Sequence, residues 1–275
     1  MRRLVLLLLF SGCASVSSVE GPQAKLHVDD GGSGRGVPVV FVHGNGANLN
    51  QWRYQLDHVR SGRRAVALDL RGMGESERAR NGDYSIAAMT DDIEAVVAKL
   101  KLRRFVIVGH SYGGAVVAAY VAKHPERIAG AVYADSAANI KMSDEAAEKF
   151  LNALRKNKDG VVSQWFAPIL ENASDSVKAE VLKSVHETNV EALTGALNGL
   201  RAVDTVANAE TYHGPRLAIV AAPLERAESF HQQVPSIRAV KMEGVSHWLM
   251  LDKPDEFNRI LDEFLRGVDA SESRH

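Results

Sequence analysis

The sequence predicts an α/β protein in which helices cover both faces of a mostly parallel sheet. Short apolar runs rich in β-branched residues alternate along the chain with segments of helical periodicity. The 275 residues are 45% hydrophobic and 24% charged, which is the mixture of a folded globular domain. Lys and Arg number 33 against 34 Asp and Glu, so the charge balance gives no reason to expect a nucleic-acid partner.

The chain begins with the features of an export signal. Residues 1–3 are a short cationic start, residues 4–10 are an unbroken apolar run, and Cys13 follows among small residues. The run is too short to span a bilayer, which requires about 20 apolar residues. Residues 9–13 resemble a bacterial lipoprotein signal, although Phe10 stands where such signals usually have Leu.

This resemblance implies that residues 1–12 are removed and that Cys13 becomes a lipidated first residue. Residues 13–23 would then form a polar tether, and the protein would be exported and anchored by lipid in the bacterial cell envelope. The alternative is an ordinary secretory signal with an incidental cysteine. Because Cys13 is the single cysteine of the chain, neither alternative allows an intramolecular disulfide.

Residues 24–136 carry the first part of the predicted core. Its strands are expected at residues 37–42, 65–68, 105–108 and 128–133, and its helices at residues 50–60, 86–100 and 115–123. The segment from residue 86 places Ile93, Val96, Val97 and Leu100 at the spacing of one helical face. Strands connected through helices favour parallel pairing, with both faces of the sheet covered.

A helical block interrupts the strand pattern at residues 137–213. Helices are expected at residues 143–156, 176–186 and 190–200, and Ser143 is placed to cap the first of them. Strands return at residues 217–221 and 237–242, and a helix at residues 254–266 ends the core, which resumes at 214–268. The inserted block is expected to form a lid. Residues 269–275 are expected to be a flexible tail.

The segment from Gly109 to Gly113 contains the strongest candidate nucleophile. Ser111 stands between a predicted strand and a small-residue helix, with glycines on both sides that let the backbone turn tightly. A serine hydroxyl is a weak nucleophile and needs a base. His247 follows the last predicted strand, so it can reach the same edge of the sheet as Ser111. We therefore expect these two residues to act together.

Residues 42–46 follow the first long strand and offer a site for a developing oxyanion. Acyl transfer needs hydrogen-bond donors already aimed at that oxygen. We assign the backbone N–H groups of Asn45 and Tyr112 to this role, whereas the Asn45 side chain either adds a donor or shapes the turn. In the loop at residues 69–76, Asp69 and Arg71 are expected to form an ion pair.

In this order, these motifs resemble the α/β-hydrolase superfamily over about residues 24–266. Residues 246–254 also resemble the segment that surrounds that family's catalytic histidine. The resemblance implies about eight strands, a lid after the sixth, and a Ser-His-acid triad that uses neither metal nor organic cofactor. The segment from His43 to Asn45 also resembles haloalkane dehalogenases. Those enzymes use an aspartate nucleophile where this chain has Ser111, so dehalogenation and epoxide opening are disfavoured.

The acid of the triad has two candidates. Most family members place it after the seventh strand, where this chain has a short loop containing Glu225 and no aspartate. The other position used in the family follows the sixth strand, where this chain has Asp135. The short loop favours Asp135, and either carboxylate would orient the ring of His247.

An apolar cluster in the lid block bears on the substrate. Trp165 and Phe166 are assigned to an acyl pocket, with the alternative that they only pack a lid helix on the core. We expect a serine hydrolase of small or medium uncharged carboxylic esters, with lactones and thioesters open. The alternative from another class is a surface-anchored ligand-binding or scaffold lipoprotein without catalysis.

Overall fold

The computed structural model describes residues 15–274 and is built around one sheet of eight strands. The strands are β1 (Ser15–Glu20), β2 (Lys25–Gly31), β3 (Val39–Val42), β4 (Ala65–Leu68), β5 (Phe105–His110), β6 (Ile128–Ala134), β7 (Arg216–Ala221) and β8 (Arg238–Met242). Their order in the sheet is β1-β2-β4-β3-β5-β6-β7-β8. Pairs β1/β2 and β2/β4 are antiparallel and the remaining pairs are parallel. The predicted fold class is therefore confirmed.

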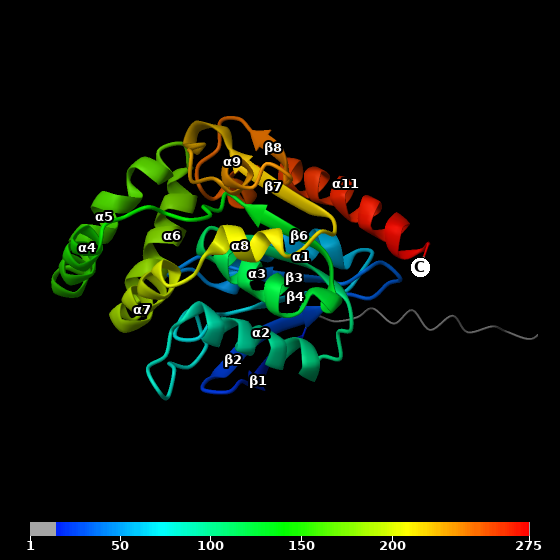
Figure 1. Cartoon of the computed structure of the whole chain (residues 1–275), viewed down its shortest axis with the longest axis horizontal. Coiled ribbons are helices and arrows are strands. Elements are labelled where there is room, and N and C mark those ends of the chain that lie inside the picture. The colour runs from blue at the N-terminus through cyan, green and yellow to red at the C-terminus, as the bar shows by residue number, and fades with distance from the viewer. Residues whose placement is uncertain (1–14, 275) are drawn as a thin grey trace, which may run out of the picture.

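Helices lie on both faces of this sheet (Figure 1). They are α1 (Arg53–Arg60), α2 (Ile86–Lys99), α3 (Tyr112–Lys123), α4 (Asp144–Lys156), α5 (Lys158–Phe166), α6 (Asp175–Glu187), α7 (Val190–Arg201), α8 (Thr205–Glu210), α9 (Phe230–Gln233), α10 (Leu249–Asp252) and α11 (Pro254–Glu272). In β3, Val40 and Val42 pack in the layer of α2 and α3, whereas Val39 and Phe41 pack in the layer of α1 and α11. This alternation buries all four residues of β3.

The helices between β6 and β7 form the inserted block. In Figure 1, α4, α5, α6 and α7 stand to one side of the sheet, whereas α8 lies over α3. Ser143 caps α4 by accepting a hydrogen bond from the N–H of Ala146 at 3.2 Å. Ala209 of α8 belongs to the core cluster that also contains α3, so this last helix of the block packs on α3 over the sheet.

Two expected boundaries differ from the structure. Residues 15–20 form β1, where the sequence predicts a polar tether. The segment lacks an apolar signal because only Val19 is buried and the strand is held by backbone pairing to β2 at the sheet edge. Residues 269–272 are helical and are not a tail, because Asp269 accepts hydrogen bonds from Arg63 at 2.8 Å and from the N–H of Val37 at 3.0 Å.

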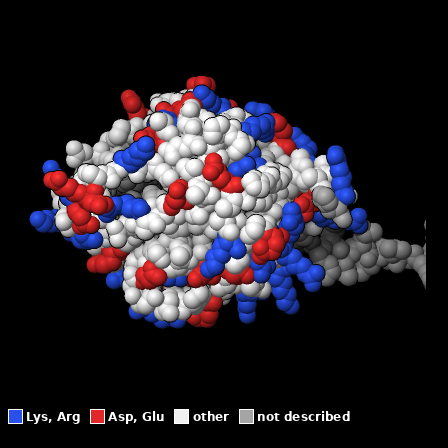
Figure 2. Space-filling model, viewed as in Figure 1, with Lys and Arg blue, Asp and Glu red and all other residues white. Residues whose placement is uncertain are grey.

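The predicted signal at residues 1–12 and Cys13 lie outside the described residues. Across residues 15–274, no helix combines the length and apolar character needed to cross a bilayer. Basic and acidic side chains are interspersed over the face drawn in Figure 2, without a region of one sign. This distribution agrees with the nearly equal totals of 33 basic and 34 acidic residues.

Candidate active site

Ser111 occupies the sharp turn between β5 and α3. Its backbone has φ 53° and ψ −120°, a conformation that is costly for a residue with a Cβ. The neighbouring glycines are required by close backbone approach, since a Cβ on Gly109 would lie 2.4 Å from the carbonyl oxygen of Gly113. The N–H of Ser111 donates to the carbonyl oxygen of Ala134 on β6 at 3.0 Å. The strained serine is thereby fixed at the end of two parallel strands.

His247 and Asp135 form a close, nearly buried pair. The Nδ1 atom of His247 lies 2.6 Å from Oδ2 of Asp135, with side-chain exposures of 9% and 8%. The second carboxylate oxygen of Asp135 accepts the N–H of Ala221 at 3.0 Å. An ionised carboxylate only accepts hydrogen bonds, so Nδ1 of the ring is the donor. The Nε2 atom of a neutral His247 ring is then left as the acceptor.

Glu225 has other partners. Its carboxylate contacts Nζ of Lys241 at 2.5 Å, Nε2 of His231 at 2.7 Å and Nε2 of Gln232 at 2.8 Å. Hydrogen bonds from Lys241, and then from His231 and Gln232, lower the pKa of Glu225 to about 2. Of the two carboxylates left open by the sequence, the structure brings Asp135 to the histidine and holds Glu225 elsewhere.

The main chain of His247 is held from two sides. Its N–H donates to the carbonyl oxygen of Ile169 in the lid at 3.0 Å. Its carbonyl oxygen accepts a hydrogen bond from Nε2 of His110 at 2.8 Å. Burial lowers the pKa of His110 well below its ordinary value, so this ring is neutral. His110 was not singled out from the sequence, although it stands directly before the candidate nucleophile.

The loop after β3 and the start of α3 carry the two candidate oxyanion donors. Within residues 15–274, the backbone N–H groups of Asn45 and Tyr112 donate to no protein acceptor. Tyr112 begins α3, where an N–H has no partner inside the helix and the helix dipole favours negative charge. The side chain of Asn45 donates to the carbonyl oxygen of Leu193 on α7 at 3.1 Å. This side chain therefore ties the loop to the lid.

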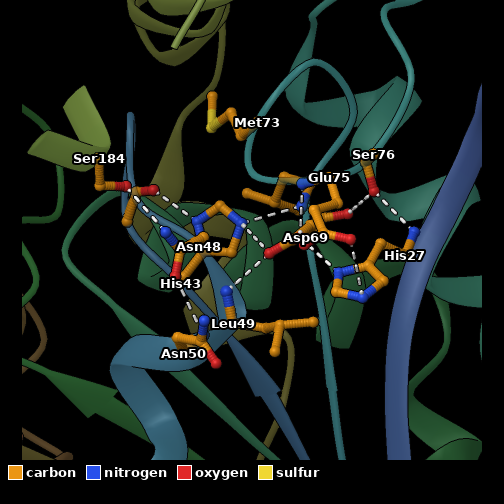
Figure 3. A network of polar contacts seen from close by, with 12 residues as sticks. His27, His43, Asn48, Leu49, Asn50, Asp69, Met73, Glu75, Ser76 and Ser184 are labelled. Atoms are coloured by element: carbon orange, nitrogen blue, oxygen red, sulfur yellow. Dashed lines mark hydrogen bonds and ion pairs between the residues drawn. The ribbon is translucent and has the colours of Figure 1, made fainter. Parts of the chain in front are cut away.

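A polar network supports the start of this loop (Figure 3). Nδ1 of His43 donates to the carbonyl oxygen of Gly44 at 2.7 Å, and its Nε2 accepts the N–H of Leu70 at 2.9 Å. Figure 3 shows Asp69 between His43 and His27, with Oδ2 of Asp69 2.8 Å from Nδ1 of His27. Burial lowers the pKa of His43, which favours the neutral ring that this bonding pattern requires.

The predicted ion pair between Asp69 and Arg71 is wrong. Arg71 forms two hydrogen bonds with the buried carboxylate of Asp92 on α2, at 2.6 and 2.7 Å. Asp69 instead accepts the backbone N–H groups of Leu49 at 2.6 Å and Glu75 at 2.9 Å. The carboxylate of Asp69 therefore holds the loop backbone in place by accepting these N–H groups. It does not pair with Arg71, the nearby cation in the sequence.

A cavity between the lid and the sheet edge brings the candidate residues together. It encloses about 1070 Å³, including the part open to solvent, and its wall includes Ser111, His247, Asn45 and Tyr112. The remaining lining residues are mostly apolar lid and core residues, namely Ala47, Ala115, Ala137, Ile140, Leu154, Val162, Trp165, Phe166, Ile169, Val185, Leu193, Leu197, Leu200 and Trp248. Within residues 15–274, no hydrogen bond joins Ser111 Oγ to another residue.

The two predicted substrate-binding residues both line this cavity. Phe166 is buried and its ring lies 5.6 Å from that of Trp248, so it also packs the lid on the core. Trp165 is 48% exposed and contacts Phe150 with a ring separation of 4.9 Å. Sequence analysis did not identify most of the other apolar wall residues. They lie in helices whose periodicity indicates which residues are buried but not which part of the protein they contact.

Among the described residues, no group of three or more His, Cys, Asp or Glu is placed to hold a metal ion.

Comparison with known proteins places this architecture in a family. A profile described as alpha/beta hydrolase fold matches residues 37–205, more than half of the chain. Epoxide hydrolase 3 of Xenopus tropicalis is 26% identical, covering 88% of this chain and 75% of its own length. The 2-hydroxymuconate semialdehyde hydrolase of Pseudomonas putida is 25% identical, covering 87% and 91%. A thermophilic esterase from Thermogutta terrifontis has a similar structure, with a TM-score of 0.82, 23% identity and coverage of 93% of this chain and 100% of that one. The chain therefore belongs to the α/β-hydrolase fold family.

Proposed function

We propose that the chain is a serine hydrolase that cleaves small or medium carboxylic esters through Ser111, His247 and Asp135. The observation that carries the proposal is the 2.6 Å contact between Nδ1 of His247 and Asp135, beside a cavity lined by both His247 and Ser111. This contact assigns the ring the tautomer that a general base needs. Within residues 15–274 no hydrogen bond joins Ser111 Oγ to His247, and in this proposal that bond forms when substrate binds, because catalytic hydrogen bonds often tighten only in the complex.

In the acylation step, Ser111 Oγ attacks the ester carbonyl carbon while Nε2 of His247 takes the hydroxyl proton. The N–H groups of Asn45 and Tyr112 donate to the negatively charged oxygen that forms. The bond to the leaving alcohol then breaks, and His247 returns the proton to that alcohol. Asp135 stabilises the imidazolium present between these two proton transfers.

In the deacylation step, His247 takes a proton from water, and the hydroxide attacks the acyl carbon. The bond to Ser111 Oγ breaks, the carboxylic acid leaves, and the proton returns to the serine. The relatives carry names of different reactions, so the family alone does not choose among them. Serine at the nucleophile position favours carbonyl substrates, and lactones and thioesters follow the same steps with a different leaving group.

The proposal is tested by hydrolysis of p-nitrophenyl butyrate together with labelling by a serine-directed phosphonate. We expect turnover, and mass spectrometry of the labelled protein should find the phosphonyl group on Ser111. A non-catalytic scaffold would bind the reagent reversibly, without turnover or a covalent adduct. Labelling at another serine would remove Ser111 from the mechanism.

We also propose that Cys13 anchors the exported protein by lipid. The support is the sequence around Cys13, which resembles a lipoprotein signal. Because β1 begins at Ser15, a lipid on Cys13 would hold this sheet edge close to a bilayer. The full chain expressed in bacteria should partition into the detergent phase of Triton X-114, and Cys13→Ser should move it to the aqueous phase. Ser18→Ala, which changes an exposed residue of β1, is the control. A mature protein with an unacylated first residue would contradict the proposal.

A further inference from the structure

Arg226 is the one Lys, Arg, Asp or Glu among the described residues that line the cavity. It follows β7 and the 3₁₀ turn Ala222–Leu224, on the loop before α9. The residue is exposed and lines the cavity, which places Arg226 at the rim of the cavity. The rest of the wall consists of apolar side chains and the groups assigned to catalysis. A charged side chain beside an apolar wall is one of the few polar groups that can orient a ligand in such a cavity.

The loop that carries Arg226 is held in place by its own backbone and by the lid. The N–H of Arg226 donates to Oγ of Ser229 at 3.2 Å, and its carbonyl oxygen accepts the N–H of Ser229 at 3.0 Å. Ala138, at the start of the lid, donates its N–H to the carbonyl oxygen of Glu228 at 2.7 Å. The cation is therefore carried by an ordered loop, which reduces the entropy lost when it binds an anion.

The acidic residues near Arg226 do not pair with its guanidinium. Within residues 15–274, the guanidinium of Arg226 has no hydrogen-bond or ion-pair partner. Glu225 is engaged by Lys241 and His231. Glu228 lines a separate hollow together with Asp204. Among the described residues that line the cavity, no carboxylate is present to neutralise Arg226.

We propose that Arg226 binds a carboxylate carried by the substrate, so that the preferred esters bear an anionic group besides the scissile ester. The inference rests on the proposed hydrolase function and deepens it by naming a substrate class. The planar guanidinium donates two parallel hydrogen bonds that match a carboxylate. Because Arg226 is exposed, water and salt screen part of this attraction, so its strength should depend on ionic strength. This proposal replaces the expectation of uncharged esters, which considered only Trp165 and Phe166.

Two matched substrate pairs test the proposal. Mono-4-nitrophenyl adipate and methyl 4-nitrophenyl adipate place the charge, or its neutral ester, on the acyl side. 4-Acetoxybenzoate and methyl 4-acetoxybenzoate do so on the leaving-group side. The measured quantity is the ratio of kcat/KM for the anionic and neutral members. Comparing this ratio between variants cancels the intrinsic reactivity of each ester, after subtraction of the uncatalysed rate.

Arg226→Gln should lower the ratio about tenfold for at least one pair, the scale expected for one charge-assisted contact at a partly exposed site. Arg226→Lys should lower it less because the charge remains, and added salt should lower the wild-type ratio. Arg259→Gln removes an exposed charge from α11, away from the cavity, and should leave the ratio unchanged. Equal ratios in wild type, Arg226→Gln and Arg259→Gln for both pairs would overturn the inference.

The failure of this inference is distinguishable from failure of the hydrolase proposal. If the wild-type protein hydrolyses none of the esters, the proposed function fails and Arg226 is judged by binding alone. Calorimetry should then detect adipate binding to the wild-type chain and about tenfold weaker binding to Arg226→Gln. Equal affinity of these two proteins for adipate, or no binding to the wild type, would overturn the assignment. Unchanged circular dichroism shows that the variant is folded.

Discussion

Ser111→Ala should lower kcat for p-nitrophenyl butyrate about a millionfold, as expected when a triad serine is removed, and leave only the small residual rate that substrate binding and the oxyanion donors supply. The reason is chemical: without Oγ no acyl-enzyme forms, and His247 has no hydroxyl proton to accept. Initial rates at saturating substrate, measured with purified protein, check this. Turnover near the wild-type rate in this variant would exclude Ser111 as the nucleophile.

The same substitution should leave the fold intact. Within residues 15–274, Ser111 Oγ has no hydrogen-bond partner, so its removal leaves no buried group unpaired. Alanine keeps the Cβ, and the free energy of unfolding in urea should change by no more than about 0.5 kcal/mol. Ser111→Gly is a useful companion because glycine relieves the strain at φ 53°. It should be equally inactive and more stable, by about 1 kcal/mol.

Asp135→Asn should lower kcat by about 10⁴ with a small change in KM, the effect of removing an orienting carboxylate. Asp135 accepts two hydrogen bonds, from the N–H of Ala221 and from Nδ1 of His247. Asparagine has one oxygen and one NH₂ group. If the oxygen keeps the bond to Ala221, the NH₂ group faces Nδ1 and selects the opposite tautomer of His247. The Nε2 atom then carries the proton and no longer accepts one from serine.

Glu225→Gln is the matched control for this measurement. It also converts a carboxylate to an amide, but on a loop whose partners are Lys241, His231 and Gln232. We expect kcat to remain within about twofold of wild type, since surface changes of this kind cost little. A large loss in Glu225→Gln with a small loss in Asp135→Asn would reverse the assignment of the acid. Small losses in both would mean that neither is the acid.

Much of the fold follows from local sequence patterns. The parallel strands were predictable because both faces are buried, which produces continuous apolar runs such as residues 105–108. The β1 and β2 strands were missed. β1 is exposed at all residues but Val19, so its backbone pairing to β2 leaves no side-chain pattern in the sequence. β2 buries Leu26 and Val28 on one face, an alternation that is too short to stand out in the sequence. The helical residues 158–166 were missed as well, because their apolar face is short.

The sequence by itself determined the serine turn, because the spacing of Gly109, Ser111 and Gly113 encodes a local backbone geometry. It also determined that a histidine follows the last strand. Tertiary structure decided which carboxylate contacts that histidine, since Asp135 and Glu225 both follow strands that end at the same sheet edge. The backbone of Asp135 turns at φ 41°, where its side chain contacts His247, whereas Glu225 is drawn to Lys241.

Which residues line the cavity was likewise determined only by the tertiary structure. Arg226 is an ordinary loop residue in the sequence. In the structure it lines the cavity, on a loop that a hydrogen bond from the N–H of Ala138 to the carbonyl oxygen of Glu228 joins to the start of the lid. Periodicity and turn residues report on neighbours in the chain, so they specify elements and tight turns. The direction in which a loop side chain points depends on contacts between segments roughly 90 residues apart, as from 138 to 228, and only the packed structure contains those contacts.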